Sequence, residues 1–149
     1  MKKIEDIQEL RSIQMGILDE VHCFCEAHGL RYFLSSGTLI GAVRHKGYIP
    51  WDDDIDIYMP RKDYEQFIQI YSDETGRYRV INPLTEPHYY YTFAKVVDLQ
   101  TRMVETETDG YEIGVFMDIF PVDYVTDDLQ EREHIFKKKK LLYKIRRCK

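Results

Sequence analysis

The sequence predicts an α+β fold, close to α/β in character, in which one mixed sheet is flanked by helices. Length is the first reason, because 149 residues suffice for one domain with one hydrophobic core. Apolar residues also recur at helical spacing near the N-terminus, and short strand-like runs follow them. Helices and strands mixed in this way are typical of a single sheet covered by helices.

The first half of the chain begins with a helix, because its apolar residues form a single stripe and Gly29 suits the helix end. Thr38 lies at or near the N-cap of a second helix, and Pro50 stiffens the loop after it. The expected elements are a helix over residues 1–28, a strand over 31–36, a helix over 38–45, a strand over 54–59 and a helix over 61–71.

Strand patterns dominate the second half until the chain becomes helical again near its end. Turn residues separate the strand candidates, and Pro121 is expected to end the last of them. From Lys137 to Lys149 eight residues are Lys or Arg and none is acidic, so the final helix is basic. The expected elements are strands over 78–82, 89–98, 101–107 and 112–120 and a helix over 127–149.

Charge and hydropathy exclude several classes of protein. The net charge is −5, and the first 136 residues hold 13 basic and 26 acidic side chains, which excludes general nucleic-acid binding. The N-terminus is charged and no apolar run approaches the ~20 residues of a membrane span, which predicts a cytoplasmic protein. The basic C-terminal helix could rest on anionic lipid at the inner face of a membrane, or be a solvated helix face.

Three cysteines, Cys23, Cys25 and Cys148, fit free thiols and not a disulfide framework. Two histidines, His22 and His28, flank the first two cysteines and suggest a zinc cluster. On a helix, however, Cys23 and Cys25 point about 200° apart. Ordinary packing is therefore the expected role of these side chains.

Four carboxylates fall within five residues at the start of the predicted strand 54–59. Like charges this close repel one another unless a cation lies between them. Alternation along a strand puts Asp54 and Asp56 on one face with Cα atoms ~6.6 Å apart, so both could bind one divalent cation. Asp52 lies at the strand entrance and could add a ligand. Oxygen ligands alone favour Mg²⁺ or Mn²⁺ over zinc.

A further carboxylate, Asp118, is a lone acid inside the apolar run "GVFMDIF". An ionised Asp at such a position costs free energy unless it is paired or bound to metal. We expect it to complete a metal site with Asp54 and Asp56. The alternatives are a turn cap before Pro121 and an ion pair with a Lys or Arg.

Residues suited to binding phosphate lie just upstream of the acidic run. The sequence "SSGT" joins a predicted strand to a predicted helix, where Gly37 lets the backbone approach a ligand and free N–H groups face an anion. Ser36 and Thr38 add hydroxyl donors. Arg44 and Lys46, just past the helix, could neutralise a diphosphate.

The run "GTLIGAVRHKGYIPWDDDIDIYMPRKDYEQF" resembles the signature of the LicD family, which includes the fukutin-related proteins. The match is almost residue for residue from Gly37 to Tyr64. "TFAKVVDLQTRM" and "FMDIFPVD" resemble later segments of the family, so the resemblance covers roughly residues 20–123. It implies the nucleotidyltransferase fold, in which a Gly-Ser or Gly-Thr turn accompanies an acid-x-acid strand and one further acid.

The resemblance also implies roles for single residues. Gly37 with Thr38 match the turn, and Asp54, Asp56 and Asp118 match the catalytic acids that hold Mg²⁺ or Mn²⁺. Known members transfer phosphocholine, or a polyol phosphate, from a CDP-linked donor to cell-surface glycans such as lipopolysaccharide, teichoic acid or capsule. A CDP-activated donor, a glycan acceptor and peripheral membrane contact are therefore the expected partners.

Two further features are open to more than one interpretation. Lys95 is a candidate for phosphate binding, although a strand lysine usually faces solvent. The run Tyr89–Tyr91 is expected to pack, although an aromatic face can also receive the cation of choline.

Two other functions stay open at this point. One is a nucleotidyltransferase that acts on a small molecule or a protein, because the same three acids serve both reactions. The other is a non-catalytic fragment that binds metal and nucleotide. Family members usually carry a further C-terminal region, which a chain that ends at Lys149 is expected to lack.

Overall fold

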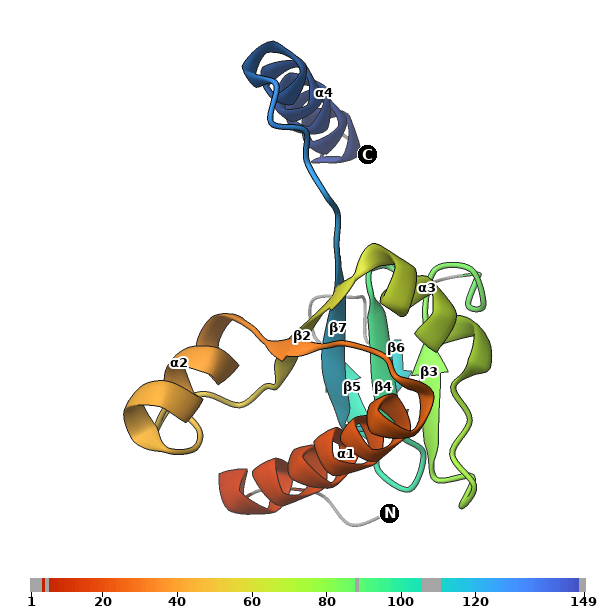
Figure 1. The fold of residues 1–149 in the computed structure, drawn as a ribbon. Helices are drawn as coiled ribbons and strands as arrows, with labels where there is room; N and C mark the ends of the chain where they lie inside the picture. Colours follow the sequence, from red (N-terminus) through yellow and green to blue (C-terminus); the bar gives the residue numbers. More distant parts are fainter. Residues whose placement is uncertain (1–3, 5, 88, 106–110, 148–149) are drawn as a thin grey trace.

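The structure, a computed structural model, describes residues 4, 6–87, 89–105 and 111–147, and it confirms the α+β fold (Figure 1). The elements in chain order are α1 (Ile7–His28), β1 (Phe33–Leu34), α2 (Ser36–His45), β2 (Asp56–Pro60), α3 (Arg61–Ile70), β3 (Tyr78–Ile81), β4 (Ala94–Asp98), β5 (Met103–Glu105), β6 (Tyr111–Ile113), β7 (Phe116–Val122) and α4 (Leu129–Arg147).

Five strands form one mixed sheet in the order β1-β2-β7-β4-β3. Strands β2 and β7 are parallel, and the other neighbouring pairs are antiparallel. Parallel neighbours need a crossover connection, which here contains α3 and the strands β3, β4, β5 and β6. Strands β5 and β6 form a separate two-stranded sheet. The crossover therefore brings two distant parts of the chain, β2 and β7, side by side.

Helices α1 and α3 pack on the same face of the sheet, where the core lies (Figure 1). Ile57 of β2 and Ile119 of β7 are paired in register and fully buried under them. Phe24 of α1 meets Phe67 of α3 edge to face, with ring centroids 5.7 Å apart. Each such apolar side chain contributes about 1.5–3 kcal/mol when fully buried. The opposite sheet face carries charged side chains together with aromatic ones such as Phe116 and Phe120.

Helix α1 confirms the expected N-terminal helix within the described residues. Asp6 caps its start, because the Asp6 carboxylate accepts a hydrogen bond from the Gln8 N–H at 2.9 Å. Gly29 ends it with φ of 64°, the left-handed conformation that glycine adopts without steric cost.

Two sequence expectations are wrong at the end of the sheet. The single strand predicted over 112–120 is split into β6 and β7, which belong to different sheets. Pro121 does not end the strand, because it lies within β7 and pairs with Met59. The register of β4 with β7 stops at Ile119, so Pro121 has a strand neighbour on one side only, where proline is tolerated.

Several boundaries also differ. Strand β2 begins at Asp56, so Asp54 precedes it, and Tyr89–Tyr91 precede β4. The N-cap of α2 is Ser35, whose side chain makes no capping bond, and Thr38 lies inside the helix. The Thr38 hydroxyl oxygen instead accepts a hydrogen bond from the Asp56 N–H at 2.9 Å.

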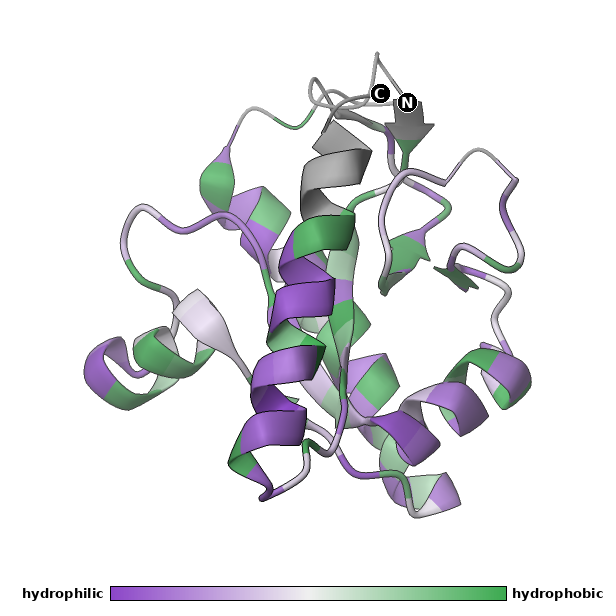
Figure 2. Cartoon of the chain, turned by 90° about the horizontal axis from the view of Figure 1, so that it is seen from above, coloured by the Kyte–Doolittle hydropathy of each residue, from purple (hydrophilic) through white to green (hydrophobic). Residues whose placement is uncertain are grey.

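Helix α4 stands away from the sheet on an extended connection (Figure 1). Figure 2 shows mostly hydrophilic residues on it, interrupted by hydrophobic ones. Ile135, Phe136, Leu141 and Leu142 are exposed there. Within the parts of the chain described above, no helix has the length and apolar character needed to cross a membrane.

Candidate metal and phosphate site

Three charged side chains lie side by side on the sheet face opposite α1 and α3. Asp118 of β7 is in register with Asp56 of β2 on one side and with Lys95 of β4 on the other. The Lys95 Nζ atom lies 2.7 Å from Asp118 Oδ1. The ion pair considered for Asp118 is therefore present, and it joins β4 to β7.

Lys95 is buried, with only 2% of its side chain exposed, which excludes the alternative of a solvent-facing strand lysine, whereas its role in phosphate binding stays a prediction. Its Nζ atom lies 3.4 Å from the ring centroid of Phe116, 4.5 Å from that of Tyr91 and 5.5 Å from that of Phe93. Such cation–π contacts stabilise a buried ammonium group. Tyr91 thus packs on Lys95, as expected, whereas Tyr90 is 61% exposed.

A second acidic group lies in the loop before β2. Asp52, Asp53 and Asp54 each offer a carboxylate oxygen, and these atoms all lie within 4.8 Å of one another. The loop turns here, because the Asp52 N–H donates to the Ile49 carbonyl at 3.0 Å. The turn lets consecutive residues converge, which alternation along a strand would forbid.

The structure therefore divides the predicted acids into two neighbouring groups. Asp54 lies with Asp52 and Asp53, and Asp56 lies beside Asp118. Asp53 was missed, because strand alternation was assumed to begin at Asp54. Among the residues that the structure describes, Asp52–Asp54 form the one group of three or more His, Cys, Asp or Glu side chains whose possible ligand atoms already lie within 4.8 Å of one another.

The pKa values show that the two acidic groups share one electrostatic environment. Burial, followed by the charges of Asp56, Asp52 and Asp53, raises the pKa of Asp54 to about 6. Burial also raises the pKa of Asp118 to about 6, where Lys95 lowers it and the carboxylates of Asp56 and Asp54 raise it further. Burial likewise raises the pKa of Asp56. A cation among these carboxylates would relieve their repulsion.

The Ser36–Thr38 turn adjoins both acidic groups. Ser36 has a φ of 47°, an unusual conformation for a residue with a side chain, and its hydroxyl donates a hydrogen bond to the Asp56 carboxylate. Gly37 packs against the Asp52 carboxylate so closely that a Cβ atom there would collide with it. The turn also begins the ten-residue helix α2, whose first N–H groups suit an anion.

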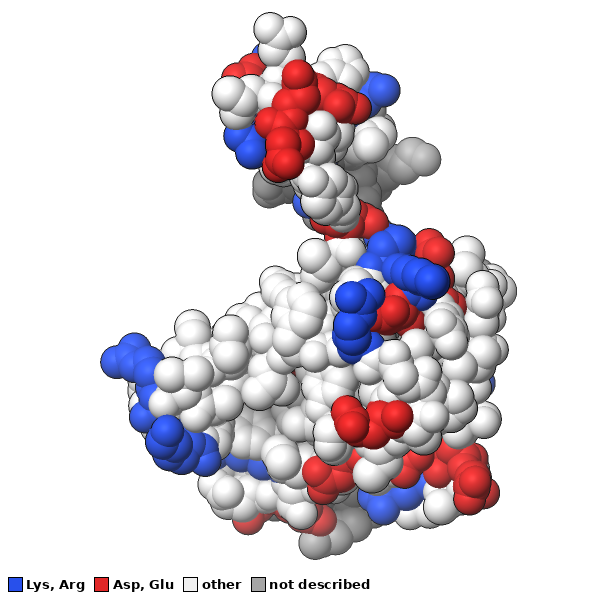
Figure 3. All heavy atoms as spheres, in the orientation of Figure 1, with Lys and Arg blue, Asp and Glu red and all other residues white. Residues whose placement is uncertain are grey.

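Arg44 and Lys46 lie at the other end of α2. Six residues of helix place the Cα of Arg44 roughly 9 Å along the axis from that of Thr38. Lys and Arg side chains gather over this projecting end in Figure 3. The structure thus brings Ser36, Gly37 and Thr38 to the acids but leaves Arg44 at a distance.

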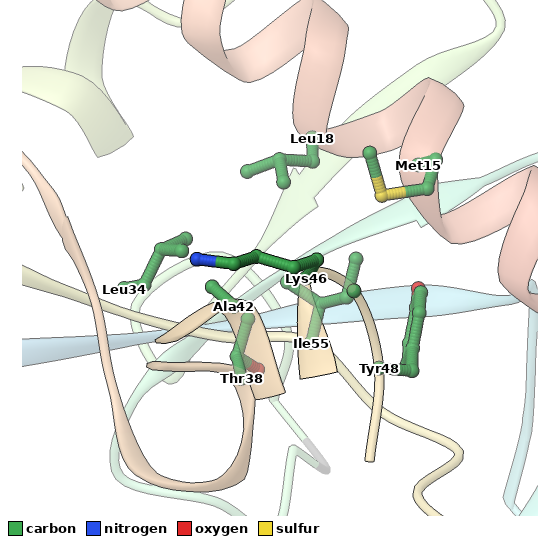
Figure 4. A pocket seen from close by; sticks show the side chains of 9 residues that line it. Met15, Leu18, Leu34, Thr38, Ala42, Lys46, Tyr48 and Ile55 are labelled. Atoms are coloured by element: carbon green, nitrogen blue, oxygen red, sulfur yellow. The ribbon is translucent and has the colours of Figure 1, made fainter. Parts of the chain in front are cut away.

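Lys46 lies across a pocket of about 350 Å³ between α1 and α2, and Figure 4 shows its ammonium group reaching toward Leu34. The pocket is otherwise mainly apolar, and Thr38 connects it to the acidic site. Its lining residues are Met15, Leu18, Leu34, Thr38, Ala42, Lys46, Gly47, Tyr48 and Ile55.

Cys25, His22 and His28 of α1 have ordinary structural contacts, whereas Cys23 is exposed. Cys25 is buried, and burial raises the pKa of its thiol to about 12. The Nδ1 atom of His28 lies 2.9 Å from the Phe24 carbonyl oxygen, and that of His22 lies 3.1 Å from the Tyr32 hydroxyl.

Comparison with known proteins shows which family this chain resembles. The family model described as "LicD/FKTN/FKRP, nucleotidyltransferase domain" matches residues 29–147. The chain is 40% identical to the lipopolysaccharide cholinephosphotransferase LicD of Haemophilus influenzae over 130 residues, which cover 86% of this chain and 48% of that protein. It is 43% identical to the human ribitol 5-phosphate transferase FKRP over 51 residues, or 34% of this chain and 10% of that protein. The chain thus spans about half the length of the bacterial relative and a much smaller part of the human one.

Proposed function

The chain belongs to the LicD/FKTN/FKRP family of nucleotidyltransferase domains, and from this premise we propose that it takes part in transferring phosphocholine, or a polyol phosphate, from a CDP-linked donor to a cell-surface glycan. One observation carries the proposal. Asp56 and Asp118 are neighbours on the sheet face opposite α1 and α3, where the Ser36–Thr38 turn and the Asp52–Asp54 loop meet them. This arrangement combines a phosphate-binding turn with clustered acids, as phosphoryl transfer requires.

The donor atoms of the site fit a hard divalent cation. Carboxylate oxygens are the ligands that Mg²⁺ and Mn²⁺ prefer, and the Asp52–Asp54 oxygens already converge. We propose that Asp54, Asp56 and Asp118 hold the ion, with Asp52 and Asp53 at its rim. When bound, the ion would neutralise the donor diphosphate and the charge that develops on the leaving CMP.

The side chains of the site have separate tasks in the proposed reaction. The Ser36–Thr38 turn and the first N–H groups of α2 bind phosphate oxygens of the donor. The acceptor hydroxyl attacks the phosphorus atom of the transferred group, so that a new O–P bond forms while the P–O bond to CMP breaks. The hydroxyl proton passes to one of the carboxylates of the site, which acts as the general base.

The proposal is tested with the donor first. Isothermal titration of CDP-choline, CDP-ribitol and CDP-glycerol, with and without Mg²⁺, is expected to show binding only when the ion is present. The double variant Asp54→Ala/Asp56→Ala should bind none of them. A folded wild-type protein that binds no CDP compound in Mg²⁺ or Mn²⁺ would contradict the proposal.

A nucleotidyltransferase is the second candidate, because the matching family model is described as a nucleotidyltransferase domain. The products separate the two reactions. A phosphotransferase releases CMP and leaves phosphocholine or polyol phosphate on the glycan, whereas a nucleotidyltransferase leaves the nucleotide on its acceptor. Mass spectrometry of the modified acceptor distinguishes them directly.

A further inference from the structure

Arg11 of α1 binds the main chain of the loop that carries the acidic residues. Its Nη2 atom donates to the carbonyl oxygens of Ile49 at 2.9 Å, Pro50 at 2.9 Å and Asp52 at 2.7 Å. Its Nε atom donates to the same Asp52 oxygen at 3.2 Å. The planar guanidinium group is suited to this task, because it presents several donors in a fixed geometry.

Gln14, one turn further along α1, holds the next residue of the same loop. Its Nε2 atom donates to the Asp53 carbonyl at 2.8 Å, and its Oε1 atom accepts from the Tyr48 hydroxyl at 3.1 Å. Only 3% of Gln14 is exposed, so both of its polar atoms are buried and satisfied by the loop. Arg11 also lies over the Tyr48 ring, 4.9 Å from its centroid.

The atoms to which Arg11 donates indicate that it holds the backbone of the loop and not its carboxylates. A guanidinium group beside several carboxylates normally forms an ion pair with one of them, because charged hydrogen bonds are the strongest available. In the contacts that the structure describes, Arg11 instead donates to main-chain oxygens. The loop is thereby held by its backbone, and the carboxylates of Asp52–Asp54 remain directed to one another.

We propose that Arg11 and Gln14 are positioning residues that hold the main chain of residues 49–53, so that the acidic side chains are arranged in advance for a divalent cation. The inference rests on the proposed function. It assigns a task to α1, which precedes the region matched by the family model. Outer residues that orient metal ligands matter, since their loss typically weakens metal binding by about 10–100-fold.

The chain offers a direct probe of this loop. Trp51 is the one tryptophan in the sequence, it is 79% exposed, and it lies between two residues whose carbonyls Arg11 binds. The fluorescence anisotropy of the protein therefore reports the mobility of residue 51, with or without a metal ion. Titration with Mn²⁺, followed by calorimetry, measures the affinity of the site separately.

The test compares two variants with two matched controls. Arg11→Lys keeps the charge but loses the planar fork, and Gln14→Leu keeps the volume but loses both hydrogen bonds. Gln8→Leu changes an exposed glutamine of the same helix. Arg31→Lys changes an arginine that pairs with Asp63 at 2.7 Å, outside the 49–53 loop. Thermal melts of all four variants report any change in overall stability.

We expect Arg11→Lys and Gln14→Leu to bind Mn²⁺ about tenfold more weakly than the wild type and to lower the Trp51 anisotropy. Both controls should leave both quantities unchanged. Folded variants with wild-type affinity and anisotropy would overturn the inference, as would an equal loss of affinity in Arg31→Lys. If Arg11→Lys does not fold, Gln14→Leu decides.

The failure of the proposed function is distinguishable from the failure of this inference. A wild-type protein that binds neither Mn²⁺ nor Mg²⁺ contradicts the proposed function. It also contradicts the proposal that the Arg11 and Gln14 contacts prepare a metal site. Unchanged anisotropy in both metal-free variants contradicts the holding of the loop itself, whatever the wild type binds.

Discussion

Asp54 shows the conflict between stability and chemistry at the scale of one residue. Its charge is disfavoured by burial and by three neighbouring carboxylates. We expect Asp54→Asn to raise the free energy of unfolding at pH 8 by about 1 kcal/mol, after allowance for solvent screening, and to raise the Tm by roughly 2–4 °C. Cation binding should fall in the same variant. Thermal melts and Mn²⁺ titrations measure the two effects, and a lower Tm at pH 8 would contradict the first.

The raised pKa values also predict how stability depends on pH. Asp54 and Asp118 have folded-state pKa values of about 6, above the ordinary value of 3.8. Between about pH 4 and pH 6 the folded state therefore binds more protons than the unfolded state. The free energy of unfolding therefore decreases as pH rises from about 4 to about 6 and then levels off. Urea denaturation of metal-free protein at several pH values tests this. The variant Asp54→Asn should show a shallower slope, and a wild-type stability that rises over this interval would be inconsistent with the cluster.

Breaking the Lys95–Asp118 pair is expected to lower the free energy of unfolding, whereas Asp54→Asn is expected to raise it. Lys95→Met leaves a buried carboxylate without its cation, and breaking a buried pair in this way costs about 3–5 kcal/mol. The second substitution Asp118→Asn removes the orphaned charge and should restore most of that loss. Denaturation at pH 7 of both single variants and the double variant gives the coupling free energy. Additive effects would show that the two side chains do not depend on each other.

At the scale of elements, the position of α2 depends on the close contact of Gly41 with the loop that follows the helix. A Cβ atom on Gly41 would lie 2.5 Å from the Gly47 carbonyl oxygen and 3.0 Å from the Ile49 nitrogen, both main-chain atoms that cannot easily move. We expect Gly41→Ala to destabilise the protein by about 1–3 kcal/mol. Gly47→Ala is the matched control, because a Cβ atom there meets nothing within 4 Å. Equal melting temperatures for the two variants would refute the close packing of α2 on the loop.

The elements also show what the sequence could predict. The C-terminal end of α1 and both ends of α3 were expected close to where they lie, because a helical stripe and a terminal glycine are local signals, whereas α1 begins at Ile7 and not at residue 1. Strand limits were less accurate, since a strand extends only as far as its neighbours pair with it. Thus β1 has two residues, and β6 leaves the run of β7 to join β5.

The candidate site could be predicted only in part, because local sequence signals do not show which distant residues meet it. Asp56 and Asp118 were expected to belong together, and they are paired in register. The partners that come from other elements were not foreseen. The burial of Lys95 depends on aromatic rings such as that of Phe116, which lies on another strand. Arg11 lies far from the acids in sequence. Gln14 carried a usable signal, a polar residue within the apolar stripe of α1.

Removal of metal and ligand gives a prediction for the whole molecule. A ligand at 100 times its Kd stabilises the folded state by about 2.7 kcal/mol. For a chain of this size we expect CDP-choline with Mg²⁺ to raise the Tm by roughly 5–10 °C, and EDTA to abolish the increase. Differential scanning fluorimetry measures this shift. An equal increase in the presence of EDTA would show binding that does not depend on a divalent ion.

The parallel pairing of β2 with β7 has a consequence for the time course of folding. Asp56 and Asp118 are roughly sixty positions apart, and contacts at such separation form slowly because a long loop must close first. Helix α1, whose contacts are local, can form on the microsecond scale. In a refolding experiment, circular dichroism should therefore recover before the protein gains its capacity for Mn²⁺. A nascent chain still on the ribosome would carry the first acids long before it could use them.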